Sequence, residues 1–211
     1  EEGGWPPEQM EIIEIGASLV NRLGHEVDHF QRFVRPQRRP LLTGFCRQLT
    51  HISQEQINSA APLPMVWAQF ERWLGHHQPQ LAGWGSWGDY DRKQLELEWQ
   101  RHNLNSLISQ VPHLNLKQRF AEARQLQRAV GLKSALQLAG LQFSGQQHRA
   151  LEDARNTARL LPLLLPVLPM LMSSSCACLR AMTRWWENEA RACRAESASA
   201  SPLRSSTAPR R

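Results

Sequence analysis

The chain has 211 residues, of which 41% are hydrophobic and 21% are charged, so it fits one globular domain, or one domain with an appendage. Its longest apolar run, Leu160–Met172, is interrupted by prolines and is too short to cross a bilayer, so no membrane partner is expected. The net charge of +6 permits a nucleic-acid partner but does not by itself argue for one.

The basic excess is concentrated at the end of the chain. Residues 173–211 hold seven Arg and three Glu, net +4, which leaves net +2 for residues 1–172. The end segment is also rich in Ser and Ala and shows no core-forming period, as is typical of a flexible tail. The sequence therefore predicts a folded domain over residues 1–172 and a disordered basic tail over residues 173–211.

The four cysteines match neither a disulfide scaffold nor a paired zinc-binding motif. They are Cys46, Cys176, Cys178 and Cys193. Their spacing favours a reducing, cytoplasmic location. The chain begins with Glu rather than Met, and we expect the sequence to start partway into a gene product.

The first predicted elements are two strands. The segment Met10–Val20 is rich in apolar and β-branched residues, and Val27–Val34 alternates apolar and polar residues. The residues between them, Asn21–Glu26, include a glycine and predict a turn, so the pair is expected to form an antiparallel hairpin. A loop is predicted to lead to Phe45, and a short helix is predicted to begin after Ser53.

The middle of the chain predicts helices that alternate with at least one more strand. Apolar residues recur at helical spacing over residues 64–74, and Leu81–Trp84 has the pattern of a short buried strand. Further helices are predicted over residues 90–101, 116–130, 132–138 and 150–161. This order predicts an α/β fold with an antiparallel edge at its beginning.

The most specific local signal is a histidine followed five positions later by an aspartate. His148 lies in a loop after Gly145, and Asp153 lies in the first turn of the predicted helix. A carboxylate that holds a cation beside an imidazole that removes a proton suits a metal-assisted hydrolase. The alternative from spacing alone is an ordinary helix-capping acid and an ordinary loop histidine.

A second signal is the acidic pair Asp89 and Asp91, where the predicted strand leads into the next helix. Residues at such a junction diverge in direction, so we expect only one of the two side chains to point into a site. The expectation is that Asp89 caps the helix and that Asp91 has the functional role.

Four stretches in this order resemble one family. They are residues 7–15 (PEQMEIIEI), 45–54 (FCRQLTHISQ), 88–93 (GDYDRK) and 145–159 (GQQHRALEDARNTAR). Together they are similar to the DEDDh group of 3′-to-5′ exonucleases, and most to the branch that trims the 3′ ends of histone messenger RNA and small RNAs. The resemblance extends over residues 7–161.

The resemblance implies a ribonuclease H-like fold, with a mixed five-stranded sheet flanked by helices. It also implies two Mg²⁺ or Mn²⁺ ions held by four carboxylates. On this pattern Asp91 and Asp153 correspond to the third and fourth acids, and His148 corresponds to the general base. Tyr90 and Phe45 match aromatic residues that stack on the terminal base. Phe45 could equally be a core residue.

The family's first two acids, an Asp-x-Glu pair on the first, central strand, have no counterpart in this sequence. Glu11 and Glu14 fall on the following strand, so neither is expected to replace them. We therefore expect a sheet without its first central strand. Two carboxylates compensate two cations poorly, and the chain as written is expected to have little or no activity.

The expected function is that of a metal-dependent 3′-to-5′ exonuclease. Its expected partner is the 3′ end of single-stranded RNA, more than DNA, and its expected product is the 5′-mononucleotide. A second hypothesis is a catalytically inactive nucleic-acid-binding or interaction module of the same fold. A third is a proofreading subunit associated with a polymerase.

Overall fold

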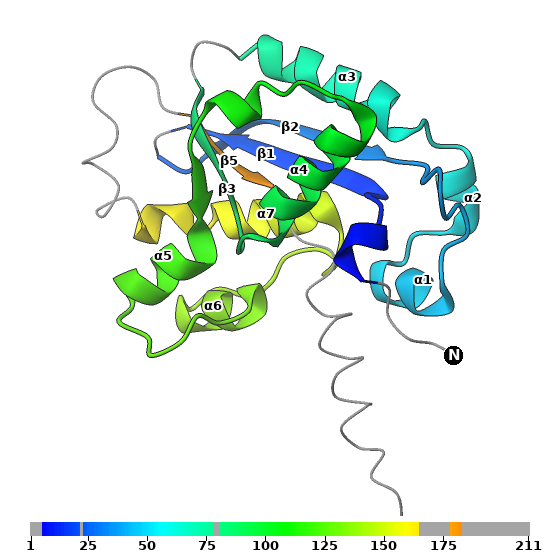
Figure 1. Cartoon of the computed structure of the whole chain (residues 1–211). Coiled ribbons are helices and arrows are strands. Elements are labelled where there is room, and N and C mark those ends of the chain that lie inside the picture. Colours follow the sequence, from blue (N-terminus) through cyan, green and yellow to red (C-terminus); the bar gives the residue numbers. More distant parts are fainter. Residues whose placement is uncertain (1–5, 22, 78–80, 165–177, 183–211) are drawn as a thin grey trace, which may run out of the picture.

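The computed structural model of the chain describes residues 6–21, 23–77, 81–164 and 178–182. Within these residues the strands form one five-stranded mixed sheet in the order β2-β1-β5-β3-β4 (Figure 1). The strands are β1 (Glu14–Val20), β2 (Glu26–Phe33), β3 (Leu81–Ser86), β4 (His113–Asn115) and β5 (Cys178–Met182). The helices are α1 (Gly44–Thr50), α2 (Gln54–Asn58), α3 (Leu63–Gly75), α4 (Tyr90–His102), α5 (Leu116–Ala123), α6 (Leu132–Leu138) and α7 (Ala150–Ala158). The predicted α/β fold is confirmed.

The expected hairpin at the beginning of the chain is present. β1 and β2 pair antiparallel, with Ala17 opposite Phe30, and Gly24 adopts a φ of 80° in the turn between them. β1 is almost entirely buried, whereas in β2 only Phe30 is buried and the other positions are exposed or intermediate. This difference follows from the sheet order, because β2 lies at the edge and β1 has a neighbour on each side.

Helices cover both faces of the sheet (Figure 1). Ile15, Ala17 and Leu19 of β1 pack in a core cluster with apolar residues of α3 and α4. On the other face, Val20 belongs to a cluster with apolar residues of α5, α6 and α7. Successive side chains of a strand point to opposite faces, so the even-numbered residues of β1 face α7. The side of the sheet that α7 covers is therefore also the side of the motif with His148 and Asp153.

The middle position of the sheet is occupied by β5. This strand pairs antiparallel with β1 and parallel with β3. No strand precedes Glu14 in the described residues 6–13, as expected, but the sheet is not left open at its centre. For Cys178–Met182 the prediction of a disordered tail is wrong. The physical reason is that a middle strand satisfies the backbone donors and acceptors of two neighbours at once.

The predicted elements agree with the structure over most of the chain and differ from it at two helices and one strand. Ser53 and Gln56 form a capping box at the start of α2, and α3, α4 and α6 lie close to their predicted ranges. The sequence predicts no helix where α1 lies and no strand where β4 lies. α5 ends at Ala123 rather than at Val130, and Gln125 has a φ of 50°, which no α-helix contains.

Within the described residues, no helix combines the length and the apolar character that crossing a membrane requires.

Candidate active site

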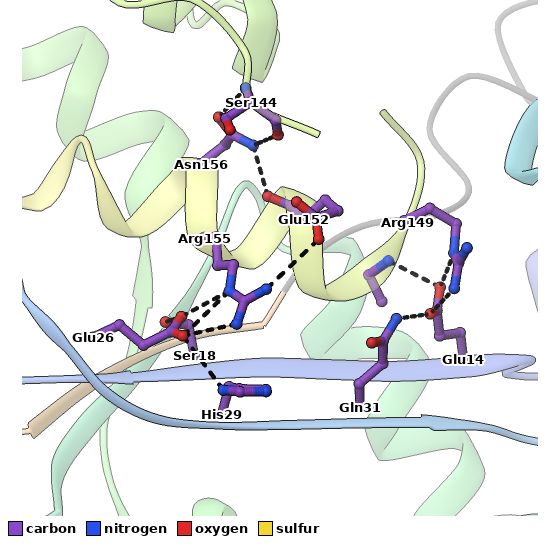
Figure 2. Close-up of polar contacts among 11 residues, drawn as sticks. Glu14, Ser18, Glu26, His29, Gln31, Ser144, Arg149, Glu152, Arg155 and Asn156 are labelled. Atoms are coloured by element: carbon purple, nitrogen blue, oxygen red, sulfur yellow. Dashed lines mark hydrogen bonds and ion pairs between the residues drawn. The ribbon is translucent and has the colours of Figure 1, made fainter. Parts of the chain in front are cut away.

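The loop before α7 is held by the side chain of Asn156. Its Oδ1 accepts the backbone N–H of Ser144 at 3.0 Å, and its Nδ2 donates to the carbonyl oxygens of Ser144 at 2.7 Å and Glu152 at 2.8 Å (Figure 2). Gly145 has a φ of 80°, and Glu152 packs directly against it, so that an added Cβ would lie 2.1 Å from Oε2 of Glu152. These contacts fix the path of the chain that leads to His148.

His148 is half-buried and has a φ of 66°, in the left-handed region that few residues other than glycine adopt. Burial lowers the pKa of His148 below its usual range, and the nearby charge of His51 lowers it further. The imidazole is therefore neutral at pH 7, the form in which it can accept a proton. His51 ends α1 in the same left-handed conformation, with a φ of 55°.

Asp153 lies in the first turn of α7 and is only 7% exposed. Its carboxylate accepts the backbone N–H of His148, so Asp153 holds the main chain at the residue that carries the expected base. Burial raises the pKa of Asp153 to about 8, and the charges of Asp91, Glu14 and Glu152 contribute to the rise. A carboxylate in this state is costly to ionise alone and is favoured by a bound cation.

Asp91 lies in the first turn of α4, and its Oδ2 is a buried carboxylate oxygen. Its charge raises the pKa of Asp153, so the two carboxylates are close enough to repel each other. The structure thus brings together His148, Asp91 and Asp153, as the sequence motif requires. Carboxylates that repel each other in a buried place are a common feature of functional sites.

The role expected for Asp89 is not observed. Asp89 occupies the N-cap position of α4, but its side chain makes no capping hydrogen bond. Instead its Oδ2 accepts from Asn115 Nδ2 at 2.8 Å, and its Oδ1 lies 3.6 Å from Arg92 Nε and 3.8 Å from His113 Nδ1. Asp89 ties the start of α4 to β4, because Asn115 belongs to that strand.

The two aromatic residues expected to bind substrate differ in their surroundings. The hydroxyl of Tyr90 donates to Gln94 Oε1 at 3.3 Å and lies 3.5 Å from Met10 Sδ. Phe45 is in α1 and is 43% exposed, which excludes the core position that the sequence left open. It lies on the same helix as His51, whose charge reaches His148.

The donor set for a metal is incomplete in the described residues. No group of three or more His, Cys, Asp or Glu side chains there could hold an ion. β5, in the middle of the sheet, contains no acidic residue. Glu11 accepts the backbone N–H groups of residues 37, 38 and 39, and so is not a replacement ligand. Asp91 and Asp153 supply two neighbouring carboxylates, and two divalent cations would need further ligands.

Sequence reasoning missed Glu14 as a neighbour of the site. Its charge acts on Asp153, and its carboxylate accepts hydrogen bonds from Arg149 and from the backbone of Ala150. The sequence carries no signal for this contact, since Glu14 and Arg149 are far apart in the chain.

The comparison with protein families identifies one match. The model of the exonuclease family RNase_T matches residues 3–161. ERI1 exoribonuclease 2 of Homo sapiens is 33% identical over 170 residues, which cover 71% of this chain and 24% of that protein. The 3′-5′ exoribonuclease 1 of Homo sapiens is 30% identical over 168 residues, covering 75% of this chain and 48% of that protein. The chain therefore spans about a quarter of the length of the first relative and about half of the length of the second.

The fold agrees with solved nuclease structures. The nuclease domain of 3′hExo, a DEDDh family member bound to rAMP, aligns with a TM-score of 0.70 at 27% identity. The alignment covers 83% of this chain and 90% of that one. A 3′-exonuclease described in the recognition of the histone mRNA stem-loop has a TM-score of 0.67 at 24% identity. The expected DEDDh resemblance and its nuclease fold are confirmed.

Proposed function

The chain belongs to the exonuclease family RNase_T, and on this premise we propose that it is built to remove nucleotides from the 3′ end of single-stranded RNA. DNA is the less favoured substrate, and the product is the nucleoside 5′-monophosphate. The observation that carries the proposal is the hydrogen bond from the backbone N–H of His148, whose imidazole is half-buried, to the buried acid Asp153 beside Asp91. Relatives named as exoribonucleases support the same reaction.

DEDDh exonucleases use divalent metal ions, and the finer proposal here is Mg²⁺ or Mn²⁺, two ions in the complete site. Asp91 and Asp153 are the residues of this chain that would hold a cation. Such an ion stabilises the charge that develops on the phosphate and makes water more acidic. It would also offset the repulsion that now raises the pKa of Asp153.

The remaining steps fall to the chain's own side chains. His148 accepts the proton of the attacking water, which its neutral state at pH 7 allows. The rings of Tyr90 and Phe45 provide apolar surfaces for the terminal base, and Phe45 is exposed enough to stack on one. From the cysteine pattern we propose a cytoplasmic location.

A second function is favoured by the composition of β5. Because the middle strand carries no carboxylate, the part of the chain that the structure describes offers Asp91 and Asp153 as candidate metal-binding acids, and two carboxylates are expected to support slow turnover or none. In that case the chain would bind RNA 3′ ends without cutting them.

The experiment that separates the two functions compares this chain with the same chain extended at its amino end by a strand bearing Asp-x-Glu. Both proteins are incubated with uniformly labelled RNA and Mg²⁺, and released 5′-mononucleotides are measured. The nuclease proposal expects the extension to raise the rate strongly. If both proteins bind RNA and neither releases mononucleotides, the binding module is the correct function.

The two acids at the start of α4 give a matched test of the metal ligands. Asp91→Asn is expected to weaken Mn²⁺ binding by at least about tenfold, because Asp91 shares a buried site with Asp153. Asp89→Asn is expected to leave Mn²⁺ affinity nearly unchanged, because its carboxylate is engaged by Asn115. Isothermal titration with Mn²⁺ measures both variants. The opposite order would exclude Asp91 as the ligand.

A further inference from the structure

A buried ion pair joins the beginning of α7 to β1. The side chain of Glu14 is 2% exposed, and its carboxylate accepts from Arg149 Nη2 at 2.9 Å and Arg149 Nε at 3.2 Å (Figure 2). It also accepts the backbone N–H of Ala150 at 3.0 Å and the Nε2 of Gln31 at 2.6 Å. We call this set of contacts the Glu14 clamp.

The clamp is fully satisfied, which is what burial of a carboxylate requires. Both oxygens of Glu14 receive donors, and the guanidinium of Arg149 also lies over the ring of Phe33, 5.2 Å from its centroid. A planar guanidinium that is bound by two nitrogens and stacked on a ring has little freedom to move. The clamp therefore fixes Arg149 in one orientation.

Close packing of the backbone adds to the clamp. A Cβ added to Gly16 of β1 would lie 2.2 Å from the backbone nitrogen of Leu151 and 2.4 Å from the carbonyl carbon of Ala150. The first turn of α7 therefore rests directly on the strand, at the point where only glycine leaves room. Glu14 and Gly16 lie on the same face of β1, so both contacts act on the same end of the helix.

The residues that the clamp holds are next to the site in the sequence and in space. Arg149 directly follows His148, and the N–H of Ala150 opens the helix whose first turn carries Asp153. Asp153 in turn accepts the backbone N–H of His148. Any movement of Arg149 is therefore passed to the imidazole and to the buried acid.

We propose that Glu14 is a positioning residue of the nuclease site, which acts through Arg149 and Ala150 to hold His148 and Asp153 in register. The expected effect on RNA cleavage rests on the proposed function, whereas the expected positioning of His148 does not. Glu14 is compensated by Arg149 and is thus a structural acid rather than a metal ligand.

The chain offers a matched control at the other end of the same helix. Arg155 of α7 pairs with Glu26 of β2 at 2.9 Å, and Ser18 also donates to Glu26, at 2.6 Å (Figure 2). This second ion pair joins α7 to the sheet as the clamp does, but it lies two turns beyond His148 and is about one third exposed. If ion pairs only stabilise the fold, losing either one should have the same kind of effect.

The test compares Glu14→Gln with Glu26→Gln in the full chain. The first measurement is the rate at which diethyl pyrocarbonate modifies His148, resolved by mass spectrometry. Glu14→Gln is expected to raise this rate at least about threefold, because a loosened loop exposes the imidazole more often. Glu26→Gln is expected to leave it unchanged.

The second measurement is single-turnover RNA hydrolysis with the protein in excess, so that slow cleavage is still counted. Glu14→Gln is expected to lower the cleavage rate by about 10- to 100-fold with RNA affinity unchanged, because misplaced catalytic groups slow chemistry rather than binding. Glu26→Gln is expected to change neither quantity. Arg149→Lys, which keeps the charge and loses the two-nitrogen contact, should reproduce the Glu14→Gln result and serves if that variant does not fold.

Three outcomes decide the inference. Equal His148 modification in Glu14→Gln, Glu26→Gln and the unchanged chain would overturn it, and so would a loss of cleavage that Glu26→Gln shares in full. Faster modification in Glu14→Gln and Arg149→Lys alone supports it. If no protein cleaves RNA, the proposed function fails, while the modification rates still show whether the clamp positions His148.

Discussion

Replacement of His148 by alanine is expected to slow RNA hydrolysis by about 10²- to 10⁴-fold, the usual contribution of a positioned general base. The structure gives the reason, since burial keeps the imidazole neutral and Asp153 holds its backbone N–H. RNA affinity should stay nearly unchanged, because a base contributes to the chemical step rather than to strand binding. The measurement is mononucleotide release by the extended chain with Mg²⁺, together with fluorescence anisotropy of bound RNA.

The matched control for this substitution is His76→Ala, a histidine at the end of α3, outside the candidate site. It is expected to leave the hydrolysis rate unchanged. Full turnover in His148→Ala would mean that another group removes the proton.

Replacement of Asp153 by asparagine is expected to stabilise the metal-free chain. Burial raises the pKa of Asp153 to about 8 from an ordinary value of 3.8, so the folded state holds a proton that the unfolded chain releases at neutral pH. Each pKa unit corresponds to about 1.4 kcal/mol, and asparagine carries no such cost, so we expect the free energy of unfolding to rise by roughly 2–4 kcal/mol at pH 7. Urea unfolding in EDTA measures it.

The pH dependence of the same variant checks the sign. For Asp153 the folded pKa lies above the unfolded one, so its effect on stability is most favourable below pH 3.8 and is lost progressively up to about pH 8. The difference between the variant and the unchanged chain should therefore grow as the pH rises through this window. Added Mn²⁺ should stabilise the unchanged chain and not the variant. A variant less stable than the parent throughout would show that Asp153 serves the fold rather than the site.

Local patterns in the sequence were sufficient for much of the fold. The hairpin follows from two apolar runs and a turn with Gly24, and α2 follows from the capping box that begins at Ser53. These elements are specified by residues close together in the chain, which is where periodicity and capping rules are most informative.

Two of the elements that the sequence did not predict, β4 and β5, depend on the tertiary structure, whereas α1 has a local signal. β4 has three residues, and its pairing with β3 determines it more than any pattern of its own. α1 begins with a side-chain cap from Thr43, a signal that the sequence contains and that was overlooked. β5 lies in a segment of tail-like composition. It forms a strand because it pairs with β1 on one side and with β3 on the other.

The candidate site could be predicted as far as its motif residues. His148 and Asp153 lie in one motif and Asp91 belongs to a short acidic stretch, but spacing alone left an ordinary capping acid and loop histidine open, and the resemblance to DEDDh exonucleases supplied the roles. The capping role of Asp89 was wrong, because Asn115 of β4 engages its carboxylate. Glu14 could not be predicted, since only the packing of α7 on β1 brings it to Arg149.

Stepwise shortening of RNA from its 3′ end is the most direct test of the central claim, that His148 is the general base of a metal-dependent nuclease whose cation Asp91 and Asp153 hold. The extended chain is incubated with 5′-labelled RNA and Mg²⁺, with and without His148→Ala. The account predicts stepwise shortening from the 3′ end that Mg²⁺ removal abolishes and the substitution slows at least about 100-fold. Shortening at the same rate with alanine at position 148, or none in the extended chain, would contradict it.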